Sequence, residues 1–290
     1  MMSIIGEMRT NNKKINRKKC NKTYWDSNID PRNLGDASVL RKFDWGLEKA
    51  FYLSSEQQYA YEKAGILRGK KVLELGAGMG VNVFLMAQKG ASVVALDLSE
   101  ERLKWLSRLA HDLNIEQRIL PVCGEAEQLP CAPGSVDLIY TKSVLIHTDL
   151  EQAIMEIHRV LSGNGVGIFI EPTVYNPLVN LYRRFFAPKE WKTITTYFDD
   201  RRIAMLRHHF DMSSVKRFYF ISFLAFFFQF GIKSLALFRI SLALLGFLDT
   251  ILFSVFPFLK RLCWFAVFTV RKKTVGGKNV PTLEQKNDET

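Results

Sequence analysis

The sequence predicts an α/β fold with a doubly wound, mostly parallel sheet and an antiparallel last strand. Between residues 70 and 171, short apolar runs alternate with amphipathic stretches, which is typical of a parallel sheet covered by helices on both faces. The first apolar run leads directly into a glycine-rich turn. From Phe218 to Leu259, 30 of 42 residues are apolar and include 12 of the 22 Phe, which predicts a hydrophobic helical insertion near the C-terminus.

Five strands and three helices are expected in residues 70–171, the first helix being VNVFLMAQKG after the glycine turn. The second helix begins after Ser99 and continues to Leu113, with Leu at spacings of three and four residues. The third begins near Asp149 and stops at LSGNG. The strands are KKVLEL ending at Leu75, SVVALD ending at Asp97, RILPVC ending at Cys123, VDLIY ending at Tyr140 and GVGIFIE ending at Glu171.

Five segments make up the expected domain organisation. Residues 1–24 should form a basic, disordered tail, because their charge is high and their apolar content low. The α/β domain should comprise 25–222 and 263–273, with cap helices in 25–68. The insertion occupies 223–262, and 274–290 form a polar tail.

The 290-residue chain carries a net charge of +11, and the location of this charge indicates the kind of partner. The net charge is +6 in 1–24, −4 in 25–200, +10 in 201–273 and −1 in 274–290. The most basic segment is also the most apolar, which favours an anionic membrane surface over nucleic acid.

Cysteine spacing and the N-terminal sequence bear on metals and location. The four cysteines include no C-x-x-C pair and no His at ligand spacing, so no metal site is expected. The N-terminus lacks the apolar core of a secretory signal. We expect a cytoplasmic protein with peripheral membrane association. No feature predicts the oligomeric state.

The insertion has two interpretations. A spanning helix needs about 20 nearly uncharged residues. The longest uncharged run here is the 15 residues from Phe218 to Ile232, because Lys233, Arg239 and Asp249 interrupt the segment. It could be a buried helical hairpin, or it could be an interfacial element or the wall of a lipophilic substrate site. Buried charges are costly and cations at a lipid interface are not, which favours the second.

The string from Val72 to Gly80, VLELGAGMG, carries the chemistry. Its glycines allow a sharp turn and close approach of a ligand to the backbone. The dinucleotide fingerprint G-x-G-x-x-G needs a third glycine where Val81 stands, so an NAD-dependent oxidoreductase is the weaker interpretation. The spacing is G-x-G-x-G.

This spacing resembles the donor-binding loop of class I S-adenosylmethionine-dependent methyltransferases, E/D-x-G-x-G-x-G. The resemblance continues in order through VVALDLS, CGEAEQLP, VDLIYTKSVLIHTD and HRVLSGNGVGIFIEP. EPTVYNPLVNLYRRF is similar to the ubiquinone C-methyltransferase-like (methyltransferase type 11) branch. The resemblance implies a Rossmann-like sheet and S-adenosyl-L-methionine as cofactor.

The resemblance also implies roles for individual residues. Asp97 would accept both ribose hydroxyls, Glu74 would help to hold the donor's ammonium, and Glu125 would accept from the adenine amino group. The expected donor-binding set is Glu74, Gly76, Ala77, Gly78, Gly80, Asp97, Leu98, Glu125 and Ala126.

Methyl transfer needs a base only if the acceptor must lose a proton. His147, just after the fourth strand, is the candidate base, with a structural role as the alternative. No N-P-P-Y string follows that strand, so nucleic acid is not the expected substrate. We expect O- or C-methylation of a small lipophilic acceptor. A catalytically inactive donor-fold protein that interacts with membranes remains the alternative.

Overall fold

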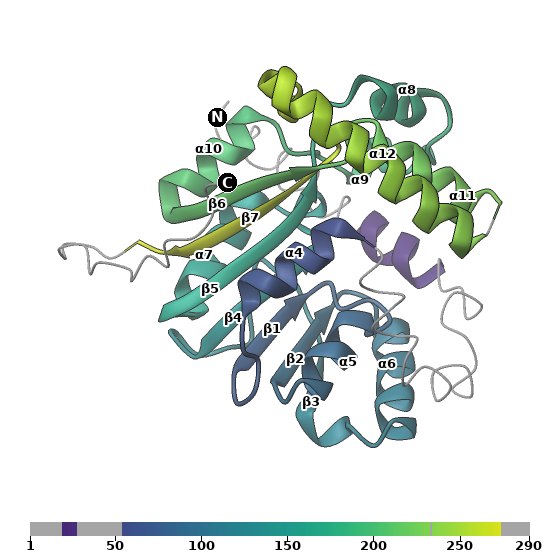
Figure 1. Cartoon of the computed structure of the whole chain (residues 1–290). Coiled ribbons are helices and arrows are strands. Elements are labelled where there is room, and N and C mark those ends of the chain that lie inside the picture. Colours follow the sequence, from purple (N-terminus) through teal and green to yellow (C-terminus); the bar gives the residue numbers. More distant parts are fainter. Residues whose placement is uncertain (1–18, 28–53, 233, 274–290) are drawn as a thin grey trace, which may run out of the picture.

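A computed structural model of the chain describes residues 19–27, 54–232 and 234–273. Seven strands form one sheet in the order β3-β2-β1-β4-β5-β7-β6 (Figure 1). Strands β1 to β5 run parallel, and β7 runs antiparallel to both of its neighbours, β5 and β6. The strands are β1 Lys71–Leu75, β2 Ser92–Asp97, β3 Ile119–Cys123, β4 Val136–Lys142, β5 Leu161–Pro172, β6 Phe210–Phe218 and β7 Phe265–Lys272. The predicted fold is confirmed.

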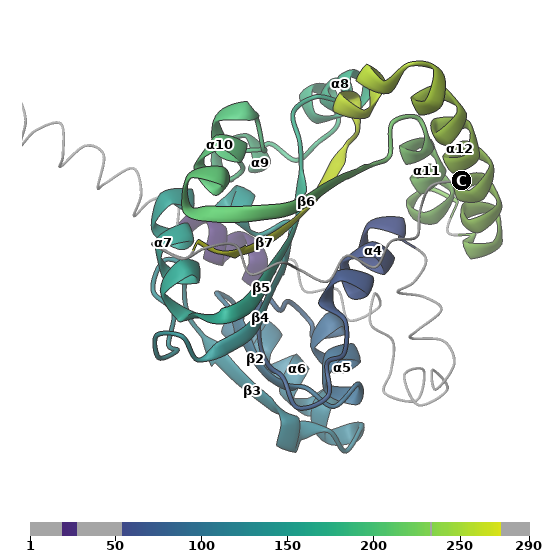
Figure 2. The same cartoon turned by 60° about the vertical axis from the view of Figure 1, so that its left-hand side comes forward.

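Helices cover both faces of the sheet (Figure 2). Ser99 and Asp149 cap two of them, each accepting a hydrogen bond from the backbone N–H three residues later. The helices are α4 Ser55–Ala64, α5 Val81–Gln88, α6 Glu100–Asp112, α7 Leu150–Val160, α8 Pro177–Phe185, α9 Trp191–Ile194, α10 Asp200–His209, α11 Phe226–Phe230 and α12 Leu235–Val255. Short 3₁₀ turns are η3 Glu116–Arg118, η4 Leu145–His147, η5 Ser222–Ala225 and η6 Pro257–Leu262.

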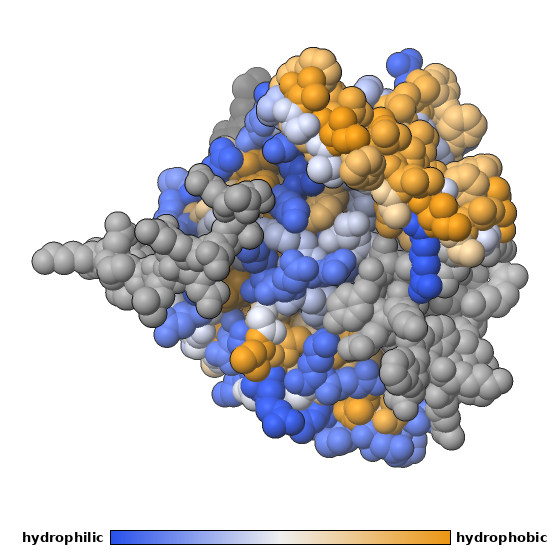
Figure 3. Space-filling model, viewed as in Figure 1, coloured by the Kyte–Doolittle hydropathy of each residue, from blue (hydrophilic) through white to orange (hydrophobic). Residues whose placement is uncertain are grey.

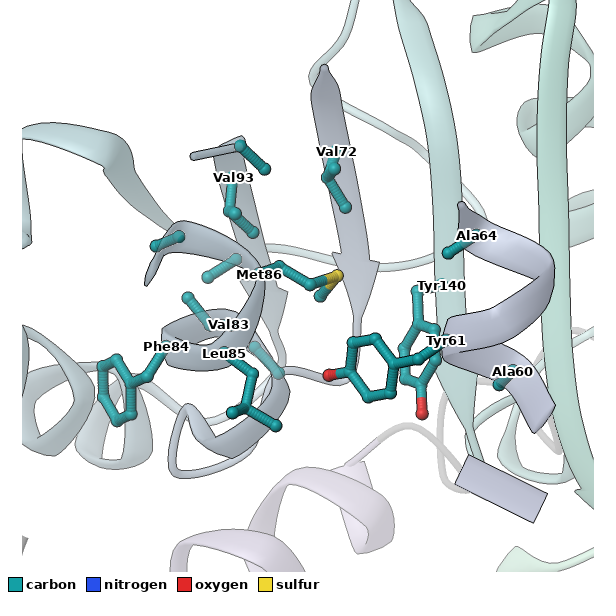
Figure 4. Packing of buried hydrophobic residues seen from close by; sticks show 14 of the residues in the cluster. Ala60, Tyr61, Ala64, Val72, Val83, Phe84, Leu85, Met86, Val93 and Tyr140 are labelled. Carbon is teal, nitrogen blue, oxygen red and sulfur yellow. The ribbon is translucent and has the colours of Figure 1, made fainter. Parts of the chain in front are cut away.

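Two hydrophobic clusters hold these layers together. On one face, α4 and α5 pack against β1, β2 and β4, where Met86, Val72 and Tyr140 are fully or almost fully buried (Figure 4). On the other face, α7 and α10 pack around Phe169 and Phe268. The cores fix the strands, and the C-terminal ends of the parallel strands β1 to β5 then lie along one edge of the sheet.

The insertion consists of η5, α11, α12 and η6, between β6 and β7. Segment Ala236–Val255 of α12 is long and apolar enough to cross a membrane by length and composition, and only 11% of its most apolar window is buried in the protein. Apolar surface accordingly gathers over α11 and α12 (Figure 3). One charge in α12, Asp249, is buried, whereas Arg239 is exposed.

Two local predictions need correction. A helix spans residues 19–27, so the tail boundary expected at residue 24 falls inside a helix. Residues 1–18, the 28–53 part of the cap region, and 274–290 lie outside the described residues. LSGNG ends α7 as predicted, but the strand expected as GVGIFIE already begins at Leu161, and its pairing with β4 shifts between Val136 and Leu138 to accommodate the extra residues.

Candidate active site

A cavity lies at the C-terminal ends of β1, β2 and β4, where ligands bind in open α/β sheets. It brings together five of the predicted donor-binding residues and His147. Its lining consists of Asn21, Trp25, Gly76, Leu96, Asp97, Leu98, Arg102, Gly124, Glu125, Ala126, Glu127, Lys142, Ser143, Val144, His147 and Thr148. Glu74, Ala77, Gly78 and Gly80, also predicted as donor-binding residues, do not line it.

Gly76 allows two loops to approach closely. Its φ is +66°, a conformation that favours glycine, and an added Cβ would lie 2.3 Å from Cγ2 of Val144. Gly78 is also left-handed, at φ +54°, and its backbone N–H donates to Asp97 Oδ2 at 2.8 Å. Glycine at position 76 therefore lets the turn after β1 approach the loop after β4. Glycine at position 78 lets the same turn form a hydrogen bond with the end of β2.

The Asp97 carboxylate is held at the end of β2. Oδ1 accepts from the backbone N–H of Ser99 at 2.8 Å, and Oδ2 accepts from Gly78. Burial raises the pKa of Asp97, while these two N–H groups and the Arg102 guanidinium oppose the rise. The carboxylate therefore has a fixed orientation beside the cavity that it lines.

Glu74 lies beneath the glycine turn and is 3% exposed. Its Oε1 accepts from Asn82 Nδ2 at 3.2 Å, and Oε2 has no hydrogen-bond partner among the described residues. Burial raises the pKa of Glu74 well above its usual value. A buried carboxylate oxygen without a donor is costly, so a ligand that donates a hydrogen bond or carries positive charge would stabilise it.

The helix at 19–27 forms a side of the cavity that the sequence did not predict. Asn21 and Trp25, four residues apart and therefore on one helical face, both line the cavity. Asn21 Nδ2 donates to the carbonyl of His147 at 3.1 Å, and the Arg102 guanidinium lies 4.6 Å from the Trp25 ring centre. The spacing of Asn21 and Trp25 is the sequence feature that indicates a shared helical face. The lysines around them indicate a solvated tail instead.

His147, in η4, also lines the cavity. Its Nδ1 is 3.1 Å from the carbonyl oxygen of Ile194, and its ring meets Trp25 edge to face at 5.5 Å. Because a carbonyl only accepts, Nδ1 must donate, and in the neutral ring Nε2 then carries the lone pair.

Glu171 supports the loop that carries His147. Its Oε1 accepts from the backbone N–H groups of Val144 and Leu145, at 3.2 and 3.0 Å. Burial raises the pKa of Glu171 to about 8, although these N–H groups act in the opposite direction. The sequence predicts Glu171 only as a strand end. Its carboxylate fixes the start of η4, so it positions this wall of the cavity.

The chain is similar in sequence to known methyltransferases. Residues 73–169 match the family model described as "Methyltransferase domain". An uncharacterised methyltransferase of Synechocystis is 32% identical over 186 residues, covering 59% of this chain and 82% of that protein. A ubiquinone biosynthesis O-methyltransferase of Bordetella avium is 29% identical over 158 residues, covering 52% of this chain and 64% of that protein.

Solved structures show the same fold at low sequence identity. A geranyl diphosphate C-methyltransferase from Streptomyces coelicolor superposes with a TM-score of 0.59 at 12% identity, covering 89% of this chain and 98% of that one. The predicted cofactor and enzyme class are both confirmed. The chain belongs to the S-adenosylmethionine-dependent methyltransferases with the class I, Rossmann-like fold.

Proposed function

We propose that this methyltransferase acts on a small lipophilic acceptor, by O- or C-methylation, with His147 as general base. The observation that carries the proposal is that Gly76, Asp97, Glu125 and His147 line one cavity. S-adenosylmethionine bound there supplies an electrophilic methyl group on a sulfonium. The chain's own residues orient donor and acceptor, which is the main requirement of an in-line displacement.

The residues present fit the donor. The Asp97 carboxylate would accept the ribose hydroxyls, and Glu125 with the backbone of Ala126 would face the adenine. The unsatisfied Oε2 of Glu74 supports a role in holding the donor's ammonium from beneath the loop formed by Gly76, Ala77, Gly78 and Gly80. Leu98, also on the lining, supplies an apolar contact next to Asp97.

His147 would remove a proton from the acceptor. The hydrogen bond from Nδ1 to Ile194 supports this role, because it holds the ring and leaves the basic lone pair on Nε2. A general base of this kind contributes about 10²- to 10⁴-fold to kcat. His147 is needed as a base only for acceptors that lose a proton, such as a phenol, and it then takes up that proton on Nε2.

Two features support a lipophilic acceptor. The relatives' names refer to ubiquinone biosynthesis and geranyl diphosphate, both of which concern isoprenoid compounds. The insertion 223–262 exposes an apolar surface along α12, where Ile240, Leu244 and Phe247 are 57–65% exposed. We place this insertion at a membrane surface, with the methyltransferase domain formed by 25–222 and 263–273. Exposed Arg239, Lys260 and Arg261 favour an anionic leaflet and peripheral attachment.

Methyl transfer from labelled S-adenosylmethionine to a panel of phenolic and isoprenoid acceptors tests the proposal. We expect His147→Ala to lower kcat about 10²- to 10⁴-fold with donor affinity within twofold of the wild type. His111→Ala, an exposed histidine on α6, is the matched control and should keep full turnover. Donor binding without transfer to any acceptor would favour an inactive donor-fold protein. Equal loss of stability and activity in His147→Ala would make His147 structural.

A further inference from the structure

Helix α8 presents its apolar side chains outward. Leu178, Leu181, Tyr182 and Phe185, with Phe186 directly after the helix, are 51–74% exposed. Their spacings of three, one, three and one residues put them on one helical face. A helix that packs on a protein core normally has the opposite arrangement, with its apolar face inward.

The opposite face of α8 packs on the protein through Val179, which is buried, and through two hydrogen-bonded polar side chains. Arg183 Nη1 donates to the carbonyl of Thr173 at 2.7 Å, and its guanidinium stacks 3.5 Å from the Tyr197 ring centre. Asn180 Nδ2 donates to the carbonyl of Val174. These hydrogen bonds fix the rotation of α8 about its axis. The inward-facing side chains of α8 therefore hold its apolar face outward.

The turn that follows β6 forms hydrogen bonds with both α8 and α12. Asn176, the N-cap of α8, donates from Nδ2 to the carbonyl of Phe220 at 2.9 Å. Asp249 of α12 accepts from the backbone N–H groups of Phe220 and Ile221, at 3.1 and 2.9 Å. Both helices lie at the same end of the molecule in two views (Figures 1 and 2). Their exposed apolar faces therefore belong to one end of a rigid framework.

The segment after α8 reaches the cavity. Ile194, at the end of α9, accepts the hydrogen bond from His147, and Trp191 Nε1 donates to the Tyr24 hydroxyl at 2.8 Å. Fewer than ten residues separate the exposed Phe186 from Ile194. The segment after α8 therefore contacts His147, one of the residues that line the cavity.

We propose that α8 is a second lipid-docking helix, which together with α12 seats this end of the enzyme on an anionic phospholipid bilayer. This inference rests on the proposed membrane-surface role of the insertion and extends it to a separate element. Arg184, Lys189 and Lys192 are exposed in and after α8, with Glu190 as the opposing charge. Exposed aromatic and leucine side chains beside cations are the composition of helices that lie in a membrane interface.

The charge distribution disfavours a second copy of the chain as the occupant of this face. An isologous contact through α8 would bring Arg184 and the neighbouring lysines of both copies together. The same cations are attracted by anionic headgroups, which stabilises the association with a membrane. Burial of the apolar side chains is not screened by salt, so added salt should weaken the association without abolishing it.

Flotation of the full chain with phosphatidylglycerol-containing vesicles, and with pure phosphatidylcholine vesicles, tests the inference. We expect the wild type to prefer the anionic vesicles, and the double variant Leu181→Ser/Phe185→Ser to lose at least tenfold in partitioning. Ile66→Ser/Leu120→Ser removes two exposed apolar side chains elsewhere, 82% and 59% exposed, and should partition like the wild type. Phe186→Ser, just outside the helix, should show a partial loss. Each variant should bind S-adenosylmethionine within twofold of the wild type, which confirms that it is folded.

A parallel variant of α12, Leu244→Ser/Phe247→Ser, separates this inference from the proposed function. Loss of partitioning in the α12 variant, with none in the α8 variant, would overturn the role of α8 and leave the insertion's role intact. A wild type that ignores both kinds of vesicle would overturn both. A wild-type dimer that the α8 substitutions convert to a monomer, with vesicle binding unchanged, would assign the face to self-association.

Discussion

The Asp97 carboxylate, at the end of β2, accepts a hydrogen bond from the backbone N–H of Gly78 at 2.8 Å. This bond joins the acidic end of one strand to the glycine turn that follows its neighbour in the sheet. The cavity is therefore built on two adjacent parallel strands, and its geometry depends on residues that contact no ligand as well as on those that line it.

Gly76 should not tolerate a side chain. In Gly76→Ala the new Cβ would lie 2.3 Å from Val144 Cγ2, in a backbone conformation with φ of +66°. We expect a loss of about 1–3 kcal/mol in the free energy of unfolding, measured by urea denaturation, together with weaker donor binding. Gly163→Ala is the control, because nothing lies within 4 Å of a Cβ there. Equal stability of the two variants would contradict the close approach.

Asp249 should be essential for anchoring α12. Its carboxylate accepts from the backbone N–H groups of Phe220, Ile221 and Ser222 and from the Ser222 hydroxyl. Asp249→Ala would leave these donors unpaired, at about 1–3 kcal/mol for each group that water does not reach. Urea denaturation should show a loss of about 3 kcal/mol or more. Thr250→Ala, at the exposed next position, should change stability by less than about 0.5 kcal/mol.

Glu171 should make stability depend on pH. Its pKa is about 8 in the folded protein, above its usual value of 4.5, so the folded state binds more protons between these values. The free energy of unfolding should therefore fall as pH rises from 5 to 8, by about 1 kcal/mol per pH unit from this group. Glu171→Gln removes the titration and should flatten the profile. An unchanged slope in that variant would show that Glu171 titrates normally.

Trp25 should contribute to donor binding. It lines the cavity and stacks with the Arg102 guanidinium, whereas Lys22 of the same helix is exposed. We expect Trp25→Ala to weaken S-adenosylmethionine binding about tenfold, equivalent to about 1.4 kcal/mol, with little change in thermal stability. Lys22→Ala is the control. Equal donor affinity in both variants would mean that the 19–27 helix does not cover the donor.

Local patterns predicted the strand ends at Leu75, Asp97 and Cys123 to the residue. Apolar runs, helix caps and glycine turns depend on residues that are close together in the chain, so they can be recognised in a single sequence. The helix at 19–27 was missed because contacts far along the chain stabilise it, including those of Asn21 with His147 and of Asp26 with Ser99. The outward apolar face of α8 was also not predicted. Arg183 and Asn180 are of residue types that usually face solvent, but here their inward hydrogen bonds place them against the protein.

Calorimetric titration of S-adenosylmethionine into the wild type and Asp97→Ala tests the central claim most directly. Loss of hydrogen bonds to a charged carboxylate should weaken binding by about 1.5–3 kcal/mol, with the fold intact by circular dichroism. Glu101→Ala, an exposed carboxylate on α6, should bind like the wild type. Equal affinity of Asp97→Ala and the wild type, or no binding by the wild type, would contradict the assignment of this cavity to the methyl donor.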